Sequence, residues 1–81
     1  MKASFTPHFQ RNYQKLSKKI QAAFDKQLVY LLKNPRHPSL RVKKYDEGRN
    51  LWQARVTKNH RFYFEIKKDL YIFHEIDPHK D

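Results

Sequence analysis

The chain has 81 residues, no cysteine and a formal net charge of +10, from 18 lysines and arginines against 8 aspartates and glutamates. This length suits one domain over residues 1–81, and the lack of cysteine excludes a disulfide framework or a thiolate metal site. No apolar run approaches the roughly 20 residues of a membrane span, and no signal-peptide core follows Met1, so we expect a soluble cytoplasmic protein. The positive charge is typical of proteins that bind a polyanion, although a generally solvated basic surface is the other interpretation. The 15% of aromatic residues favours a folded body over a basic tail.

The first half of the chain predicts one edge strand and two helices. Residues 2–5 are compatible with a short strand, and Thr6 followed by Pro7 is the pattern of a helix N-cap. A second N-cap is expected at Ser17, and Pro35 ends the helix that follows it. The apolar stripe of this second helix consists of Ile20, Ala23, Phe24, Leu28, Leu31 and Leu32. The two helices are expected to form a hairpin that covers one face of a sheet.

Beyond the linker 34–39, the apolar period changes from helical to alternating. Leu40 and Val42 alternate with basic residues, which predicts a strand, and the segment 45–50 with the only glycine predicts a turn. Three further strands are predicted at Leu51–Thr57, His60–Ile66 and Leu70–Ile76. The order β-α-α-β-β-β-β predicts an α+β domain, with a two-helix hairpin packed on a small, mainly antiparallel twisted sheet.

The register of the hairpin between strands 51–57 and 60–66 decides which residues share a face. We predict the three-residue loop Lys58–Asn59–His60, which pairs Thr57 with Arg61 and keeps apolar and charged residues on separate faces. The face under the helices then comprises Trp52, Ala54, Val56, Phe62, Phe64 and Ile66. The opposite face, called the polar face below, comprises Gln53, Arg55, Arg61, Tyr63 and Glu65, with Arg41 and Lys43 extending it.

The polar face has the composition of an RNA-binding surface, although a half-buried sheet also normally has one polar side. Arginine clamps phosphate through two parallel hydrogen bonds, and a tyrosine ring offers a platform for a base. RNA supplies its own nucleophile, the 2′-hydroxyl, so cleavage needs a base, an acid and positive charge, but no cofactor. A zinc motif starting at His74-Glu75 fails because Pro78 stands where a second histidine is required. We therefore expect neither a metal nor a cofactor.

In the order and spacing of its segments, the chain resembles the RelE/ParE superfamily of type II toxin–antitoxin toxins, especially the RelE-type mRNA interferases. The segments that carry the resemblance are Leu31–Pro35, Leu40–Arg41, Leu51–Val56, Asn59–Ile66 and Asp77–His79. The resemblance implies a small sheet with two packed helices and a metal-independent endoribonuclease. Such toxins cleave mRNA in the A site of the 70S ribosome by attack of the 2′-hydroxyl, which inhibits translation. It also implies a cognate antitoxin that wraps the toxin and blocks it.

The resemblance also assigns roles to residues. Arg61 matches the arginine that stabilises the transition state, and His79 or Lys80 occupies the position where relatives place a catalytic histidine or arginine. Gln53 and Arg55 fall where RelE itself has two basic residues, and no tyrosine follows His79 as it does in several relatives. The expected catalytic residues are Arg55, Arg61 and His79, with Glu65 as an alternative base or as the partner of an arginine. The expected RNA-binding residues are Arg41, Lys43, Lys44, Gln53, Tyr63 and Lys80.

Two other functions remain open at this stage. One is a ParE-type toxin that poisons DNA gyrase without a nuclease site, and the other is a non-catalytic RNA-binding module that depends on charge alone. The antitoxin is expected to bring acidic residues to the basic face or an amphipathic helix to the hairpin groove.

Overall fold

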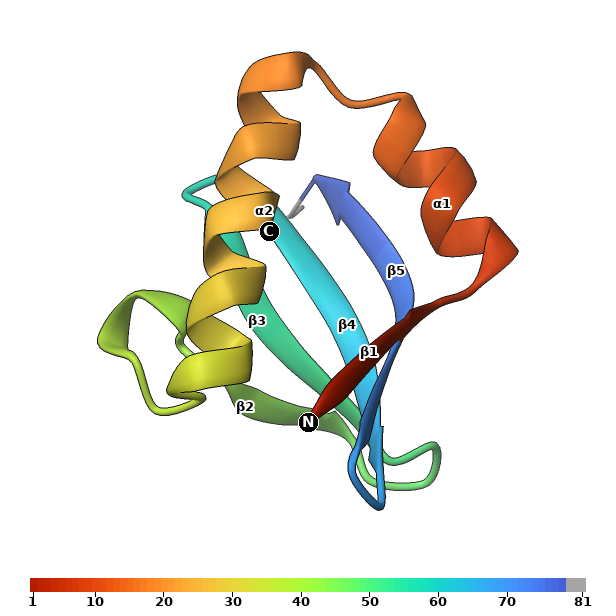
Figure 1. Ribbon diagram of the computed structural model, residues 1–81. Coiled ribbons are helices and arrows are strands. Elements are labelled where there is room, and N and C mark those ends of the chain that lie inside the picture. The colour runs from red at the N-terminus through yellow and green to blue at the C-terminus, as the bar shows by residue number, and fades with distance from the viewer. Residues whose placement is uncertain (79–81) are drawn as a thin grey trace.

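The computed structural model describes residues 1–78, Pro78 by its backbone only, and has the predicted order β-α-α-β-β-β-β (Figure 1). The helices are α1 (Pro7–Gln14) and α2 (Lys18–Lys33), and the strands are β1 (Lys2–Phe5), β2 (Lys43–Asp46), β3 (Leu51–Thr57), β4 (His60–Lys67) and β5 (Leu70–Pro78). The strands form one sheet in the order β1-β5-β4-β3-β2, in which β1 is parallel to β5 and the other pairs are antiparallel. The predicted α+β class and mainly antiparallel sheet are confirmed.

Both helices begin at the predicted N-caps. The Thr6 hydroxyl accepts a hydrogen bond from the Phe9 N–H at 3.1 Å, and the Ser17 hydroxyl accepts one from the Ile20 N–H at 3.3 Å. Asn34 has non-helical angles (φ −151, ψ 87) and caps the end of α2, as expected for a residue before proline. Of the helices in residues 1–78, neither is long and apolar enough to cross a membrane.

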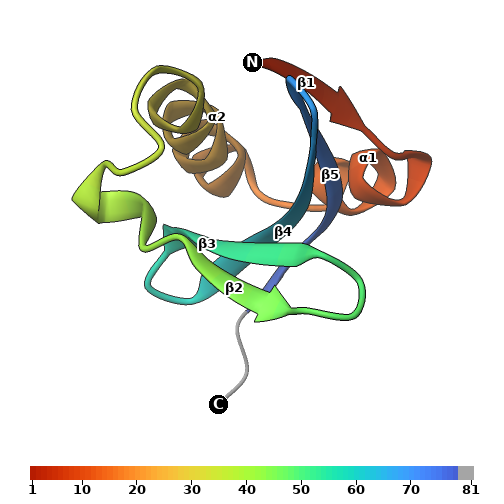
Figure 2. The ribbon, with the colours of Figure 1, turned by 90° about the horizontal axis from the view of Figure 1, so that it is seen from below.

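The two helices lie on the same face of the curved sheet (Figures 1 and 2), with α1 against β5 and α2 against β3. Phenylalanine rings fill the space between the layers, and the fully buried ones are Phe9, Phe24, Phe62, Phe64 and Phe73. Phe24 points from α2 onto Phe62 of the sheet, edge-on at 5.1 Å. The predicted apolar face of the hairpin therefore does lie under the helices.

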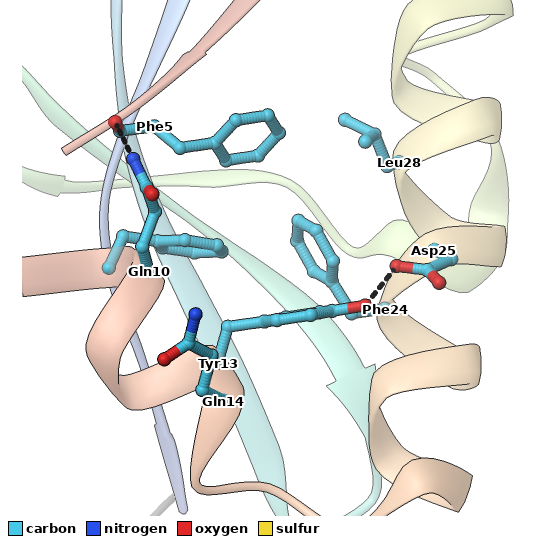
Figure 3. Close-up of a pocket in the computed structure, with 8 residues that line it drawn as sticks. Phe5, Gln10, Tyr13, Gln14, Phe24, Asp25 and Leu28 are labelled. Atoms are coloured by element: carbon cyan, nitrogen blue, oxygen red, sulfur yellow. Dashed lines mark hydrogen bonds between the residues drawn. The ribbon is translucent and has the colours of Figure 1, made fainter. Parts of the chain in front are cut away.

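The helices splay apart instead of packing tightly, and a groove of about 400 Å³ lies between them. Its walls include Phe5, Phe24 and Leu28 (Figure 3). Across this groove, the Tyr13 hydroxyl of α1 donates a hydrogen bond to a carboxylate oxygen of Asp25 on α2 at 2.8 Å. The two helices thus leave a groove between them but are joined directly by this hydrogen bond and by the contact of Phe9 with Phe24.

The predicted register of the β3–β4 hairpin is wrong by two residues. Arg61 is the partner of Arg55, not Thr57, and Thr57 is the partner of His60, so the loop is only Lys58–Asn59. A β-bulge between Arg55 and Thr57 takes up the extra residue that the prediction placed in the loop. Because the shift is an even number of residues, the predicted division into two faces survives.

The strand predicted from Leu40 begins later than expected. Pro38–Leu40 forms a single 3-10 turn, Arg41 follows in the left-handed region (φ 48), and β2 starts at Lys43 and continues to Asp46. Leu40 is fully buried through this turn, so its apolar character reflected core packing and not strand alternation.

Candidate nucleic-acid interface

The polar face lies on β3 and β4, opposite the helices, and its two arginines meet at the hairpin end. Arg55 and Arg61 are direct cross-strand partners, and Gln53 is the partner of Tyr63 in the same ladder. Directly opposed side chains lie on the same side of a sheet and within contact distance of each other. Two positive charges are therefore juxtaposed on this face, an arrangement that an anion would stabilise.

Arg61 is fixed in place by the turn that precedes it. Its Nη1 donates hydrogen bonds to the carbonyl oxygens of Thr57 at 2.9 Å, His60 at 3.0 Å and Lys58 at 3.3 Å. Across the sheet it is the partner of Asp77 on β5. A guanidinium held in this way needs little reorganisation when charge develops on a bound phosphate.

Arg55 sits next to Arg61 without comparable support. Its Nε is buried and has no hydrogen-bond partner among the described residues. Burial lowers the pKa of Arg55, and the positive charges of Arg41 and Arg61 lower it further. Arginine stays protonated at any physiological pH, so this cluster of three arginines keeps its charge.

Tyr63 and Tyr45 form an aromatic platform beside the arginines. Their ring centroids are 4.8 Å apart, and Gln53 Nε2 donates to the Tyr63 hydroxyl at 3.2 Å. Burial raises the pKa of Tyr63, and the hydrogen bond from Gln53 offsets only part of that rise, so the phenol is neutral at physiological pH. Tyr45 was expected in a turn, but the irregularity in β2 between Lys44 and Asp46 brings it onto the polar face.

A histidine–carboxylate pair also lies on this face. His74 Nε2 is 3.1 Å from a carboxylate oxygen of Glu65, whose cross-strand partner on β3 is Leu51. Glu65 is therefore removed from Arg55, the partner considered for it. His74, but not Glu65, lines an open pocket of about 330 Å³, together with Tyr45, Arg49, Leu51, Tyr63, Glu75 and Asp77. From the sequence, His74 was considered only as a metal ligand. Its position next to the core residue Phe73, in a strand of alternating residues, was a signal that it lies on the polar face.

The remaining candidates divide between the two faces. Lys43 is exposed and is the partner of Gln53, which places it on the polar face. Lys44 is the partner of Trp52 on the helix side, with its ammonium 4.5 Å from the ring centroid.

His79 and Lys80 lie outside the described residues. The last described residue, Pro78, pairs with His60 next to Arg61. Within residues 1–78, no group of three or more His, Cys, Asp and Glu side chains could hold a metal ion.

The chain matches no family model, and a comparison with curated proteins finds no match. Its fold, however, is shared with solved structures. A YoeB/ParE toxin from Agrobacterium tumefaciens has a TM-score of 0.81 at 15% identity, covering 99% of this chain and 100% of that one. A YoeB–YefM toxin–antitoxin complex from Staphylococcus aureus has a TM-score of 0.77 at 16% identity, covering 96% of this chain and 95% of that one. An archaeal RelE–RelB complex from Pyrococcus horikoshii has a TM-score of 0.78 at 16% identity, covering 95% of this chain and 92% of that one. The predicted RelE/ParE-like fold is confirmed.

Proposed function

We propose that this chain is the toxin of a type II toxin–antitoxin system and acts as a metal-independent endoribonuclease on mRNA in the ribosomal A site. The observation that carries this proposal is the cross-strand pair Arg55 and Arg61 on the half-buried polar face of a RelE/ParE-like sheet. The tyrosine platform beside the pair offers stacking surface for a base, as single-stranded RNA requires. Action on the ribosome places the protein in the cytoplasm.

The proposed reaction is the attack of a ribose 2′-oxygen on the adjacent phosphorus. The new O–P bond forms as the bond from phosphorus to the 5′-oxygen breaks, which leaves a 2′,3′-cyclic phosphate and a free 5′-hydroxyl. Arg61, fixed by the turn carbonyls, stabilises the charge that develops on the phosphorane oxygens. Arg55 holds a non-bridging oxygen of the same group.

Two proton transfers accompany this exchange of bonds. A base takes the proton of the 2′-hydroxyl, and an acid supplies one to the departing 5′-oxygen. We assign one of these steps to His79, since an imidazole titrates near working pH. Glu65, hydrogen-bonded to His74, is the alternative base.

Binding of the strand is assigned to the side chains around the arginine pair. Arg41, Lys43 and Lys80 contact the phosphate backbone, and Gln53 and Tyr63 contact a base. Lys44 is left out of this interface because it lies over Trp52 on the helix side.

The proposed regulator is a cognate antitoxin. Two of the solved structures that share this fold are complexes, one of YoeB with YefM and one of RelE with RelB. A net charge of +10 favours an antitoxin segment rich in acidic residues.

The test is expression of the chain and its variants in bacteria, with primer extension on mRNA from translating ribosomes. The parent is expected to arrest growth and cut mRNA in the A site, and His79→Ala and Arg61→Ala are expected to lose both effects. Arg11→Ala is the control, because it removes an exposed arginine from α1, outside the polar face. If both variants cut like the parent, the assigned residues are wrong. Accumulation of gyrase-cleaved DNA without cut mRNA would overturn the proposal in favour of gyrase poisoning.

A further inference from the structure

We infer that a second pocket, between α2, the Pro38–Leu40 turn and β3, binds a backbone phosphate of single-stranded RNA next to the segment held on the polar face. This second site rests on the proposed function for the origin of the strand. The pocket is open, has a volume of about 560 Å³, and is called the α2–β3 pocket below. It is lined by Ala23, Lys26, Gln27, Tyr30, His37, Pro38, Ser39, Arg41, Arg55 and Val56.

Among the described residues, the charged side chains that line the α2–β3 pocket are all cationic. Lys26, Arg41 and Arg55 each contribute a cation, and the lining contains no carboxylate among the described residues. A solvated basic surface normally intersperses charges of both signs, as Arg49 and Asp46 do in the β2–β3 turn. A concave surface with one sign of charge attracts an anion.

Arg55 supplies a donor that has no acceptor. Within residues 1–78, its Nε is the one buried side-chain nitrogen or oxygen without a hydrogen-bond partner. A buried unpaired N–H costs free energy, and a phosphate oxygen would remove that cost once the Arg55 guanidinium turns to expose this N–H to the pocket. This donor is the clearest sign in the pocket of a ligand that carries an acceptor oxygen.

The wall of the pocket is rigid because Gln27 joins three elements. This glutamine is 6% exposed, and its Nε2 donates to the carbonyl oxygens of Arg55 at 2.9 Å and Ser39 at 3.2 Å. The Ser39 hydroxyl lies 3.2 Å from Gln27 Oε1 and 2.8 Å from His37 Nδ1, and donates its one proton to either of them. A buried amide that donates to two carbonyls in this way fixes the backbone on which Arg55 stands.

An aromatic stack adds a further donor. The rings of Tyr30 and His37 are parallel, with centroids 3.9 Å apart. His37 Nδ1 accepts the backbone N–H of Ser39 at 3.2 Å, so the neutral imidazole carries its proton on Nε2. Nε2–H is thereby set as a donor on the ring that lines the pocket.

Arg41 enters the pocket on a backbone that arginine rarely adopts. Its φ of 48 lies in the left-handed region, which favours glycine or asparagine. Asn50 and Lys68 share this conformation in turns of the sheet, so it marks a change of chain direction. Here the change follows the Pro38–Leu40 turn and leaves the Arg41 side chain in the pocket lining.

A polymer fits this charge distribution better than a single nucleotide. Arg55 lines the pocket and is also the cross-strand partner of Arg61 on the polar face. Positive charge therefore continues from Arg41 through Arg55 to Arg61, and repeating phosphates would match it at more than one point. A mononucleotide would satisfy only one end.

The first experiment observes the unpaired Nε–H of Arg55 directly. Inorganic phosphate is titrated into the ¹⁵N-labelled chain at constant ionic strength, and the Nε–H resonances of Arg55 and Arg49 are followed by NMR. We expect the Arg55 proton to move downfield and to saturate. Arg49 Nε already donates to Asp46 at 2.8 Å and is expected to stay in place. If the Arg55 signal does not move, moves only as much as that of Arg49, or shifts with the same affinity in Lys26→Gln, the phosphate is not held in this pocket.

The second experiment measures affinity for a short 2′-O-methyl oligoribonucleotide, which lacks the nucleophile and cannot be cut. The variant Lys26→Gln/Arg41→Asn removes two cations, with asparagine chosen because it tolerates the left-handed backbone. The control Lys18→Gln/Lys19→Gln removes two exposed cations from the start of α2. We expect the pocket variant to bind about tenfold or more weakly, and its slope of log K against log salt to fall by about 1.4. The control is expected to match the parent.

Three results would overturn the inference. Equal losses of affinity in both double variants would mean that the RNA is attracted by the overall positive charge and not by the pocket. Tighter binding of an RNA duplex, with the same sensitivity to the pocket variant, would assign the pocket to structured RNA. Tighter binding of a poly-glutamate peptide would assign it to an acidic protein segment. Neither of these two experiments measures cleavage. A chain without nuclease activity would therefore refute the proposed function, and the phosphate titration and the affinity measurement would still test the pocket.

Discussion

On the helix side of the sheet, aromatic rings touch one another in many directions, and no single contact sets the position of the others. The ring centroid of Phe24, for example, lies 5.1 Å from that of Phe62 and 5.3 Å from that of Phe9. On the opposite side, each group depends on a few directed hydrogen bonds, as Arg61 depends on the carbonyls of its turn. The first face supplies the stability of the fold, and the second is arranged for a ligand. Substitutions on the two faces should therefore fail in different ways.

The largest effect is expected from Phe24→Ala. Phe24 is 2% exposed, and its removal leaves a cavity between α2 and the sheet. We expect a loss of about 3–5 kcal/mol in the free energy of unfolding, measured by urea denaturation with circular dichroism. Val29→Ala on the same helix, where the side chain is 47% exposed, should change it by about 0.5 kcal/mol or less. Similar unfolding midpoints for the two variants would contradict a core centred on Phe24.

Arg61→Lys tests directed geometry against charge on the polar face. Lysine keeps the positive charge but cannot bond the turn carbonyls and a phosphate with one planar fork. We expect single-turnover cleavage of ribosome-bound mRNA to fall by about 10- to 100-fold, with a small change in stability. Arg11→Lys, at an exposed arginine of α1, serves as the matched control and should cleave at the parent rate. Full activity in Arg61→Lys would mean that charge alone suffices.

Gln27→Leu tests a residue that combines features of both faces, since Gln27 is buried like the aromatic core and makes directed hydrogen bonds like the polar face. The substitution leaves the carbonyls of Ser39 and Arg55 without their side-chain donor, and we expect a loss of about 1–3 kcal/mol in unfolding free energy. The exposed Gln14→Leu on α1 makes the same chemical change and should be near neutral. Equal stability of the two variants would show that the Gln27 network is dispensable.

The smallest effect is expected at Glu75, where α1 meets β5. Burial raises the pKa of Glu75, but hydrogen bonds from His8, Asn12 and the Ile76 N–H outweigh burial, and the net pKa lies below its ordinary 4.5. A lowered folded pKa stabilises the fold above pH 4.5, and this contribution is lost as pH falls through the folded value. Glu75→Gln should therefore cost about 1 kcal/mol or less at neutral pH and almost nothing near pH 3.

Thermal midpoints of parent and Glu75→Gln across that pH range provide the measurement. Glu47→Gln, at an exposed turn position, is the control and should follow the parent at every pH. A gap between parent and Glu75→Gln that persisted in acid would rule out the carboxylate as its source.

What the sequence could predict was local. N-caps at Thr6 and Ser17, and the limits of β3, depend on neighbouring residues and were confirmed. The register of the hairpin was not recoverable, because a bulge at Val56 and a longer loop both keep the faces unmixed. The alternation still assigned the faces correctly, since the error was an even number of residues.

Features of the site that depend on distant partners were missed for a related reason. Gln27 falls on the apolar stripe of α2, and only the carbonyls of Ser39 and Arg55 explain why an amide is buried there. The pairing of His74 with Glu65 likewise depends on how β5 is shifted against β4.

The parallel pairing of β1 with β5 has a consequence for how the chain is made. Residues 2–5 pair with residues 70–73, so β1 has no partner strand until β5 has been synthesised. A nascent chain that ends after β4 lacks a whole interior strand of the sheet, and long-range pairing of this kind is slow. If the proposed activity is right, the ribosome that makes this protein has synthesised β5 before the domain can fold and act on ribosomes.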